Sequence, residues 1–537
     1  MSTRSLRPRV DSLRARTRDA LERRLGIDAR ALAAFRIAVG LVLLFDIGHR
    51  SRDLRTFYTD GGVLPRAMLV DQYPAAEYSI HALSGAAWVQ ALLFGCAAAA
   101  AAALLVGYRT RTATVLSLLL LVSVQARNPF LLNGADRLLS QLLFLAIFLP
   151  LGRRWAIDAL GDTGDVEDAA REPDPERRSE RTPRIVTPAT AAMLVSVVAV
   201  FVSNALGKAE GDTWHTGEAL HYALRLDHMT VLLGDHLVNY PLLLTVGTFA
   251  WMGLVTGAPL MILFAGRLRI AYVAVFVAAA TGMALSMAVG LFPAVLVGSF
   301  LLFLPPRFWN ALEHTLAVAV GRIDGLDRGV AVVRDATTRV RRPRPAGSAL
   351  PTPTQRRVRQ CRSFLLAALL IGVACWNVGV LGVADPFEPV DAVDPADHEW
   401  SMFAPDPSTS YGWYVVEAEI DGEPNRDVLG GTERRTDRPP DAAETVPSFR
   451  WRKYMNSLSD SDERADRFAA SMCERARSRT DSSVEAVTVT YTEQPIRLEG
   501  EREAPTTYTV VDRSCSADDA IADRNRESRP ALTARTQ

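Results

Sequence analysis

Lysine is almost absent from this chain, although basic residues are not. Of its 60 basic residues only Lys208 and Lys453 are lysines, and the rest are arginines. Cysteine is scarce too: there are five, with no C-x-x-C pair, so the common thiol redox and zinc motifs are missing. No glycine-rich phosphate loop or nucleophile elbow occurs, which leaves no signature of a nucleotide-binding or hydrolase site.

Long apolar runs fill much of the sequence up to residue 383. A membrane-spanning helix needs about 20 predominantly apolar residues. The sequence therefore predicts a polytopic α-helical membrane protein with about nine spans. The predicted spans are residues 31–48, 88–107, 113–127, 132–151, 185–207, 241–265, 269–290, 291–306 and 363–383.

Arginine-bearing connections predict how these spans are oriented. The N-terminal segment (residues 1–30) is rich in arginine and lacks the apolar core of a cleaved signal peptide. The basic connections 108–112, 266–269 and 307–362 fall on the same side of the spans as this segment. Because basic connections stay inside the cell, we expect residues 1–30 in the cytoplasm of a cell-membrane protein whose transmembrane domain covers residues 31–383.

After nine spans the polar C-terminal part would be extracytoplasmic. Alternating, β-rich runs and one amphipathic helix predict a small α+β, β-rich domain at 384–515. Composition predicts disordered linkers at 159–184 and 325–360 and a disordered tail at 516–537.

The cysteines divide between the two parts of the chain. Cys96, Cys361 and Cys375 lie in or beside predicted spans, where a thiol behaves as a small apolar group. Cys473 and Cys515 fall in the predicted external domain, where a disulfide persists once formed. The sequence does not show whether these two are close, so their pairing stays open.

Several charged residues interrupt the apolar zone. Arg36 and Asp46 lie in the first predicted span, and Asp136 with Arg137 opens the fourth. A charge at mid-bilayer costs about 2.5–3.5 kcal/mol on insertion scales, so such residues face each other or a cavity. One interpretation is structural ion pairs or positions near the interface. The other is a polar cavity near the outer leaflet that joins Asp46 and Asp136 to Lys208.

Lys208 stands at the predicted outer end of the fifth span. Burial disfavours the charged form of an amine, so a lysine here can serve as a general base. Arginine cannot, because it stays protonated. The alternative is a structural lysine that reaches the interface or pairs with Glu210 or Asp212.

Four of the eight histidines follow Lys208 closely. His215, His221, His228 and His236 are spaced by six, seven and eight residues, which matches no common metal-ligand motif. We therefore expect no metal, and favour an interfacial or substrate-side role for this segment.

Five stretches run in order along most of the chain. They are FRIAVGLVLLFDIGHRSRDLRTFYTDGGVLPR (35–66), RNPFLLNGADRLLSQLLFLAIFLPLGRRWAID (127–158), LGKAEGDTWHTGEAL (206–220), EWSMFAPDP (399–407) and RWRKYM (450–455). Together they resemble the HTTM family, the membrane proteins related to vitamin K-dependent γ-carboxylase, and suggest an archaeal or bacterial member.

The resemblance implies a function and a site. In the carboxylase, a lysine followed by a matching tryptophan and glycine deprotonates reduced vitamin K, O2 then reacts, and CO2 adds to glutamate. Lys208 matches that lysine and is the expected catalytic base, with a reduced naphthoquinone, O2 and CO2 as the cofactors. The candidate substrate-binding residues are Trp214, His215, Gly217, Asn133, Asp136 and Arg36.

One departure from the family pattern weakens the expectation of glutamate carboxylation. The family histidine expected in the stretch 130–139 is missing, and Asn133, Gly134, Ala135 and Asp136 stand there. Quinol oxidation or epoxidation is therefore favoured over glutamate carboxylation. The expected partners are a membrane lipid or quinone and, if carboxylation is retained, an exported protein; no nucleic acid is expected. A non-catalytic scaffold or transporter with the same fold is the alternative.

Overall fold

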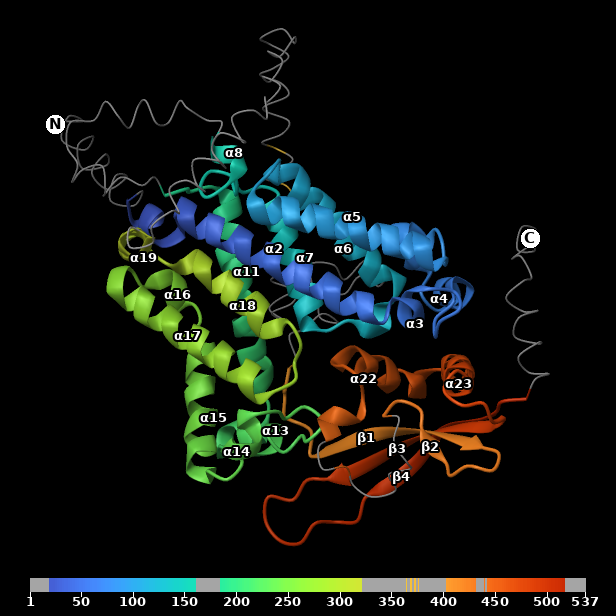
Figure 1. The fold of residues 1–537 in the computed structure, drawn as a ribbon. Coiled ribbons are helices and arrows are strands. Elements are labelled where there is room, and N and C mark those ends of the chain that lie inside the picture. Colours follow the sequence, from blue (N-terminus) through green and yellow to red (C-terminus); the bar gives the residue numbers. More distant parts are fainter. Residues whose placement is uncertain are drawn as a thin grey trace, which may run out of the picture.

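A computed structural model gives the arrangement of the chain (Figure 1). It describes residues 19–160, 184–320, 402–430, 439 and 442–516, with a few positions between 364 and 375. Nearly all of the two predicted linkers, the ninth predicted span and the predicted tail lie outside the described residues. The description below concerns the described ranges.

The first two described ranges form a bundle of helices (Figure 1). Its longer helices are α2 (Ala29–Arg52), α5 (Ala87–Val106), α6 (Thr110–Arg127), α7 (Gly134–Ala146), α11 (Pro188–Lys208), α15 (Pro241–Thr256), α17 (Gly266–Ser286), α18 (Phe292–Phe300) and α19 (Pro306–Val320). Its short elements are α3 (Leu54–Tyr58), α4 (Arg66–Gln72), α8 (Ile157–Leu160), α12 (Asp212–Thr216), α13 (Ala219–Ala223), α14 (Leu233–Leu237), α16 (Leu260–Leu263), η1 (Pro74–Tyr78), η2 (Ile80–Ala82), η3 (Pro129–Leu131) and η4 (Leu301–Phe303).

Local chemistry fixes where several of these helices begin. The Asp28 carboxylate accepts a hydrogen bond from the Arg30 amide at the start of α2. Thr187 closes a capping box ahead of α11, which opens with Pro188, and α15 also opens with a proline. A side-chain acceptor satisfies an amide that has no partner within the helix, and proline fits the first helical turn.

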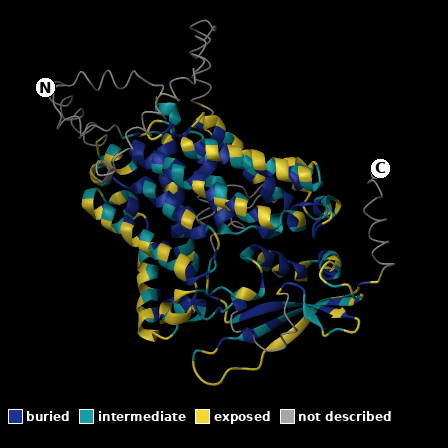
Figure 2. Ribbon diagram, in the orientation of Figure 1, coloured by how far each residue is buried: buried dark blue, intermediate teal, exposed yellow. Residues whose placement is uncertain are grey.

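Among the residues that the structure describes, four helices are long and apolar enough to cross a bilayer: α2, α5, α11 and α17. The pair Phe292–Phe303 and Pro306–Val318, bent by 105°, adds a fifth if it is one span. Only 28% of the apolar window of α5 and 22% of that of α17 are buried, so both present apolar side chains outward, as lipid-facing helices do (Figure 2). A multi-pass membrane protein follows from these helices.

The sequence predicts about nine spans where these criteria give four or five. Part of the difference lies in helices that are too short: α7 has 13 residues, α15 has 16 and α18 has nine. Helix α6 reaches 18 residues yet is not among the four, and nearly all of the ninth predicted span lies outside the described residues. The predicted span 241–265 is also interrupted, because α15 ends ahead of Gly257 and Pro259. Proline lacks the amide hydrogen needed to continue a helix, so the helix ends while the apolar run of the sequence goes on.

The basic connections meet at one end of the bundle. Arg269, in the first turn of α17, donates to the carbonyl of Arg24 at 2.9 Å, close to the start of α2. Arg36, also near the start of α2, donates to the carbonyl of Leu104 at 3.2 Å, just before the connection 108–112. The predicted common side of the N-terminal segment and these two connections is therefore confirmed.

The C-terminal part is a four-stranded antiparallel sheet with helices on one face (Figure 1). Its strand order is β2-β1-β3-β4. The elements are β1 (Ser410–Ile420), β2 (Arg426–Asp427), β3 (Val484–Pro495), β4 (Thr506–Ser514), α22 (Phe449–Asn456), α23 (Asp462–Arg477), η6 (Ala442–Thr445) and η7 (Leu458–Asp460). A disulfide joins Cys473 of α23 to Cys515 after β4, with the Cα atoms 5.7 Å apart, which settles the pairing that the sequence leaves open.

This sheet region packs on the end of the bundle opposite the basic connections. Helices α22 and α23 lie between the sheet and the bundle (Figure 1). The Tyr454 hydroxyl donates to the carbonyl of Val63 at 2.8 Å, and the Trp451 ring meets Phe57 edge-on with centroids 5.0 Å apart. The junction is thus a continuous packed interface.

Candidate functional site at the domain junction

Lys208 is the last residue of α11 and lies in this junction. Its side chain is almost fully buried, with 1% of the residue exposed. The ammonium nitrogen Nζ donates to the backbone carbonyl of Met402 and, at 3.1 Å, to that of Phe403. It also lies 4.2 Å from the centre of the Trp214 ring. The three N–H groups of a protonated lysine therefore all have acceptors: two carbonyls and an aromatic face.

The carbonyls belong to residues 402–406, which we call the strap. Two further side chains hold it: the Asn204 amide donates to Met402 O at 3.2 Å, and the Trp214 indole donates to Phe403 O at 2.9 Å. The strap comes from EWSMFAPDP, whereas Lys208 and Trp214 come from LGKAEGDTWHTGEAL. Two of the five stretches are thus in direct contact.

The far end of the strap is anchored by Asp406. Its carboxylate accepts hydrogen bonds from the amides of Asp212 (3.2 Å) and Thr213 (2.9 Å), and from the Thr213 hydroxyl. Gly211 is needed here because a Cβ atom at that position would lie 2.0 Å from the carbonyl oxygen of Pro405. The turn after α11 and the strap therefore fit only with glycine at their contact.

Lys208 has no carboxylate within ion-pair distance among the residues that the structure describes. The expected structural alternative paired it with Glu210 or Asp212, and neither makes that contact. Two effects oppose each other at this amine. Burial disfavours the ammonium, whereas the carbonyls and the Trp214 ring stabilise it.

A second group of charges lies elsewhere in the junction. Asp46 and Arg50 of α2, Asp136 of α7 and Arg450 of α22 form what we call the charge cluster. Arg50 binds Asp46 at 2.7 Å and also Asp136, and Arg450 binds Asp46. All four side chains are at most 5% exposed. Two acids and two arginines balance, so the cluster is neutral, although Nε of Arg450 is buried without a hydrogen-bond partner.

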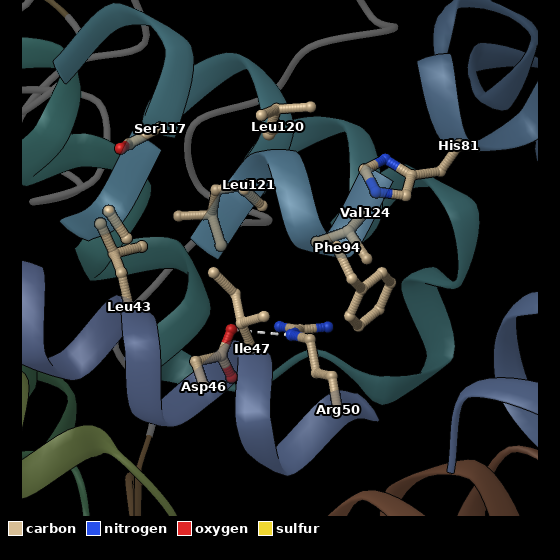
Figure 3. A pocket seen from close by; sticks show the side chains of 12 residues that line it. Leu43, Asp46, Ile47, Arg50, His81, Phe94, Ser117, Leu120, Leu121 and Val124 are labelled. Atoms are coloured by element: carbon tan, nitrogen blue, oxygen red, sulfur yellow. Dashed lines mark hydrogen bonds and ion pairs between the residues drawn. The ribbon is translucent and has the colours of Figure 1, made fainter. Parts of the chain in front are cut away.

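The cluster confirms ion pairing for Asp46 and Asp136, and it adds two partners that the sequence did not single out, Arg50 and Arg450. It also joins three more of the five stretches. A cavity of about 20 Å³ lies beside it, between the Asp46–Arg50 pair and the His81 ring (Figure 3). Room for a water begins at roughly 10–15 Å³, so this cavity is far too small for a quinone ring.

Asn133 and Arg36 have structural partners of their own. The Asn133 side chain caps α7 by accepting from the amides of Ala135 (2.9 Å) and Asp136 (3.3 Å). In return, the Asp136 carboxylate accepts a hydrogen bond from the backbone amide of Asn133. Arg36 donates to backbone carbonyls at the basic end of the bundle. Both residues therefore have hydrogen-bond partners other than Lys208.

The histidines after Lys208 lie apart from one another. Exposed His215 pairs a ring nitrogen with the carbonyl of Ala209 at 2.9 Å, and His221 pairs with the Thr245 hydroxyl at 3.0 Å. His228 lies nearly parallel to the Tyr411 ring, with centroids 6.5 Å apart. Within the described ranges, no three His, Cys, Asp or Glu side chains are placed to share a metal ion.

His228 lines a cleft of about 330 Å³ on the strap. Its lining includes Phe403, Ala404 and Asp406 of the strap together with His228, Tyr411 and Tyr491. Burial, with a smaller contribution from Arg452, lowers the pKa of His228 to about 4, so the imidazole is neutral at physiological pH.

Of the predicted site residues, the structure brings Lys208 and Trp214 together. Gly217, at φ +86°, ends α12 next to Thr245 and Phe249 of α15. The strap and Asp406 were missed as site residues, although EWSMFAPDP was noticed as a stretch. Comparison with protein-family models, characterised proteins and solved structures gives no match to this chain.

Proposed function

We propose that the protein is a multi-pass membrane enzyme that deprotonates and oxidises a quinol, with Lys208 as the base. The observation that carries the proposal is a buried amine without a carboxylate partner among the described residues, at the contact between two of the five HTTM-like stretches. Buried ionisable groups of this kind are enriched at functional sites. Membership of the HTTM family is part of the proposal.

The reaction begins with proton transfer. The neutral amine of Lys208 takes a proton from a quinol hydroxyl, which gives an ammonium and a quinolate. O2 is the oxidant, and one quinol with one O2 gives one quinone epoxide and one water. Glutamate carboxylation with CO2 is the less favoured extension, since the family histidine is missing.

The membrane arrangement is also proposed. Helices α6, α7, α15 and α18 complete nine crossings together with the longer helices and residues 363–383. The N-terminus then lies in the cytoplasm, with the sheet region outside, where the disulfide between Cys473 and Cys515 is stable.

The experiment measures O2 uptake and quinol loss by purified protein given a reduced naphthoquinone. We expect equal molar loss of both in the wild type and no turnover in Lys208→Ala. Lys453→Arg is the matched control, because Lys453 is the only other lysine and lies exposed on α22. Turnover in Lys208→Ala at the wild-type rate contradicts the proposal.

A non-catalytic membrane scaffold is the second candidate. It is favoured by the complete set of acceptors around Lys208, since an amine that only clamps the strap needs no more than these. For a scaffold, the wild type consumes no quinol, and Lys208→Ala loosens the junction without a change in any turnover.

A further inference from the structure

The strap covers the amine that the proposed reaction needs. Lys208 is 1% exposed, and its nitrogen contacts the carbonyls of Met402 and Phe403. A proton can pass from a quinol hydroxyl only across a hydrogen bond, at about 2.6–3.2 Å between heavy atoms. No reactant reaches that distance while the strap is in place.

The strap also borders open space. The cleft of about 330 Å³ is lined in part by Phe403, Ala404 and Asp406, although Phe403 also packs against neighbouring apolar side chains. Phe403 also has a φ of +55°, a left-handed conformation that is a genuine outlier for a bulky side chain. Its contacts with Lys208 and Trp214 hold it there, so losing them favours a different strap conformation.

We propose that the strap is a gate that moves into the cleft and uncovers Lys208. This inference rests on the proposed role of Lys208 as base. The same movement would let a reactant reach the amine and would make the amine more ready to accept a proton. An open strap withdraws both carbonyls that favour the ammonium, so the reactant meets an amine with fewer charge-stabilising contacts. Asp406 is the anchor, because it ties the end of the strap to the amides of Asp212 and Thr213.

A disulfide can lock the gate. A Cβ atom at Gly207 would lie 3.2 Å from the Ala404 Cβ, and disulfides join Cβ atoms about 3.5–4.5 Å apart. The test variant is Gly207→Cys with Ala404→Cys, in a chain whose cysteines outside the native disulfide are replaced by serine. Each single cysteine variant, treated with the same oxidant and reductant, is the control.

Reductive methylation with formaldehyde then reports the exposure of the amine, since mass spectrometry follows two lysines separately. A minor conformer is populated at ~0.1–10%, so Lys208 in the wild type should react about 10- to 1,000-fold more slowly than Lys453. The cross-link should slow Lys208 further by at least about tenfold and leave Lys453 unchanged. Asp406→Ala, which needs no cross-link, should speed Lys208.

Equal methylation of Lys208 in the cross-linked and reduced protein overturns the gate, as does an unchanged rate in Asp406→Ala. Turnover separates the gate from the reaction. If the cross-link shields Lys208 while the wild type consumes no quinol, the reaction fails and the gate stands. If cross-linked protein consumes quinol at the reduced protein's rate, the gate fails and the reaction stands.

Discussion

The charge cluster makes a strong prediction about stability. Replacing Arg450 by methionine keeps much of the side-chain volume but leaves Asp46 and Asp136 with Arg50 alone, so one buried negative charge is uncompensated. Breaking a buried pair by removing one partner costs about 3–5 kcal/mol. We expect the free energy of unfolding to fall by this amount in Arg450→Met.

Adding Asp46→Asn to Arg450→Met should recover most of that loss. The double variant is neutral again, since Asp136 keeps its contact with Arg50. Either single variant leaves an unpaired charge, so the two changes should be coupled by roughly 2–3 kcal/mol. Arg426→Met is the matched control, because Arg426 and Glu423 form an ion pair that is 39% and 30% exposed, and solvent screens such pairs.

The assay is denaturant unfolding followed by tryptophan emission, with Trp451 buried beside Arg450 in α22. An Arg450→Met midpoint equal to that of Arg426→Met would falsify the electrostatic reading. Losses that simply add in the double variant would also refute it, because the cluster would then not act as one unit.

Three further predictions follow from groups outside the spans. Reduction of the Cys473–Cys515 bond, which closes a separation of 42 residues, should destabilise the sheet region by about 4 kcal/mol, and alkylation should change its mass only after reduction. The pKa of His228 in the folded protein is about 4, below its unfolded value, so the folded state binds fewer protons. The free energy of unfolding should therefore fall by up to about 3 kcal/mol as pH drops from about 6.5 to about 4. His228→Gln should flatten this decline. A cysteine at exposed Ser408 should react with an impermeant thiol reagent on intact cells, whereas labelling only after lysis would place the sheet region inside.

Local patterns predicted much of the fold. Uninterrupted apolar runs predict the four long helices. The amphipathic helix predicted in the C-terminal domain is α23, whose apolar face is buried and includes Ala465, Phe468, Ala469, Met472 and Cys473. Hydropathy does not record where a helix ends or bends, so the apolar runs predict more spans than the four or five that the described helices meet by length and composition. Asn133 and Asp136, which the resemblance offers as substrate-binding residues, form the capping box of α7.

The contacts of the site could not be read from spacing. Asp46 and Arg450 are 404 residues apart, and Lys208 and Met402 are separated by 194. Periodicity relates neighbours along one helix or strand, so it carries no information about such pairs. The acceptors of Lys208 are backbone carbonyls, which every residue carries. The side chains of Met402 and Phe403 therefore gave no signal of this contact.

The scarcity of lysine bears on what Lys208 does. Elsewhere in this chain arginine binds backbone carbonyls, as Arg269 does at Phe264 (2.8 Å) and Ile262 (2.6 Å). Arginine also stacks on aromatic rings, as Arg464 does with its guanidinium carbon 3.8 Å from the Phe130 ring centre. Neither task therefore explains a lysine.

The remaining difference is that an amine gives up its proton and a guanidinium does not. Lys208→Arg should accordingly keep the fold, with a loss of about 1–3 kcal/mol from fitting a larger group into a packed site, and should lose quinol turnover entirely. Thermal unfolding and O2 uptake measured on the same preparation separate the two effects. A folded Lys208→Arg protein that turns over quinol at the wild-type rate would show that the proton of Lys208 is not used, and the lysine would then have to be explained by its smaller size over Trp214.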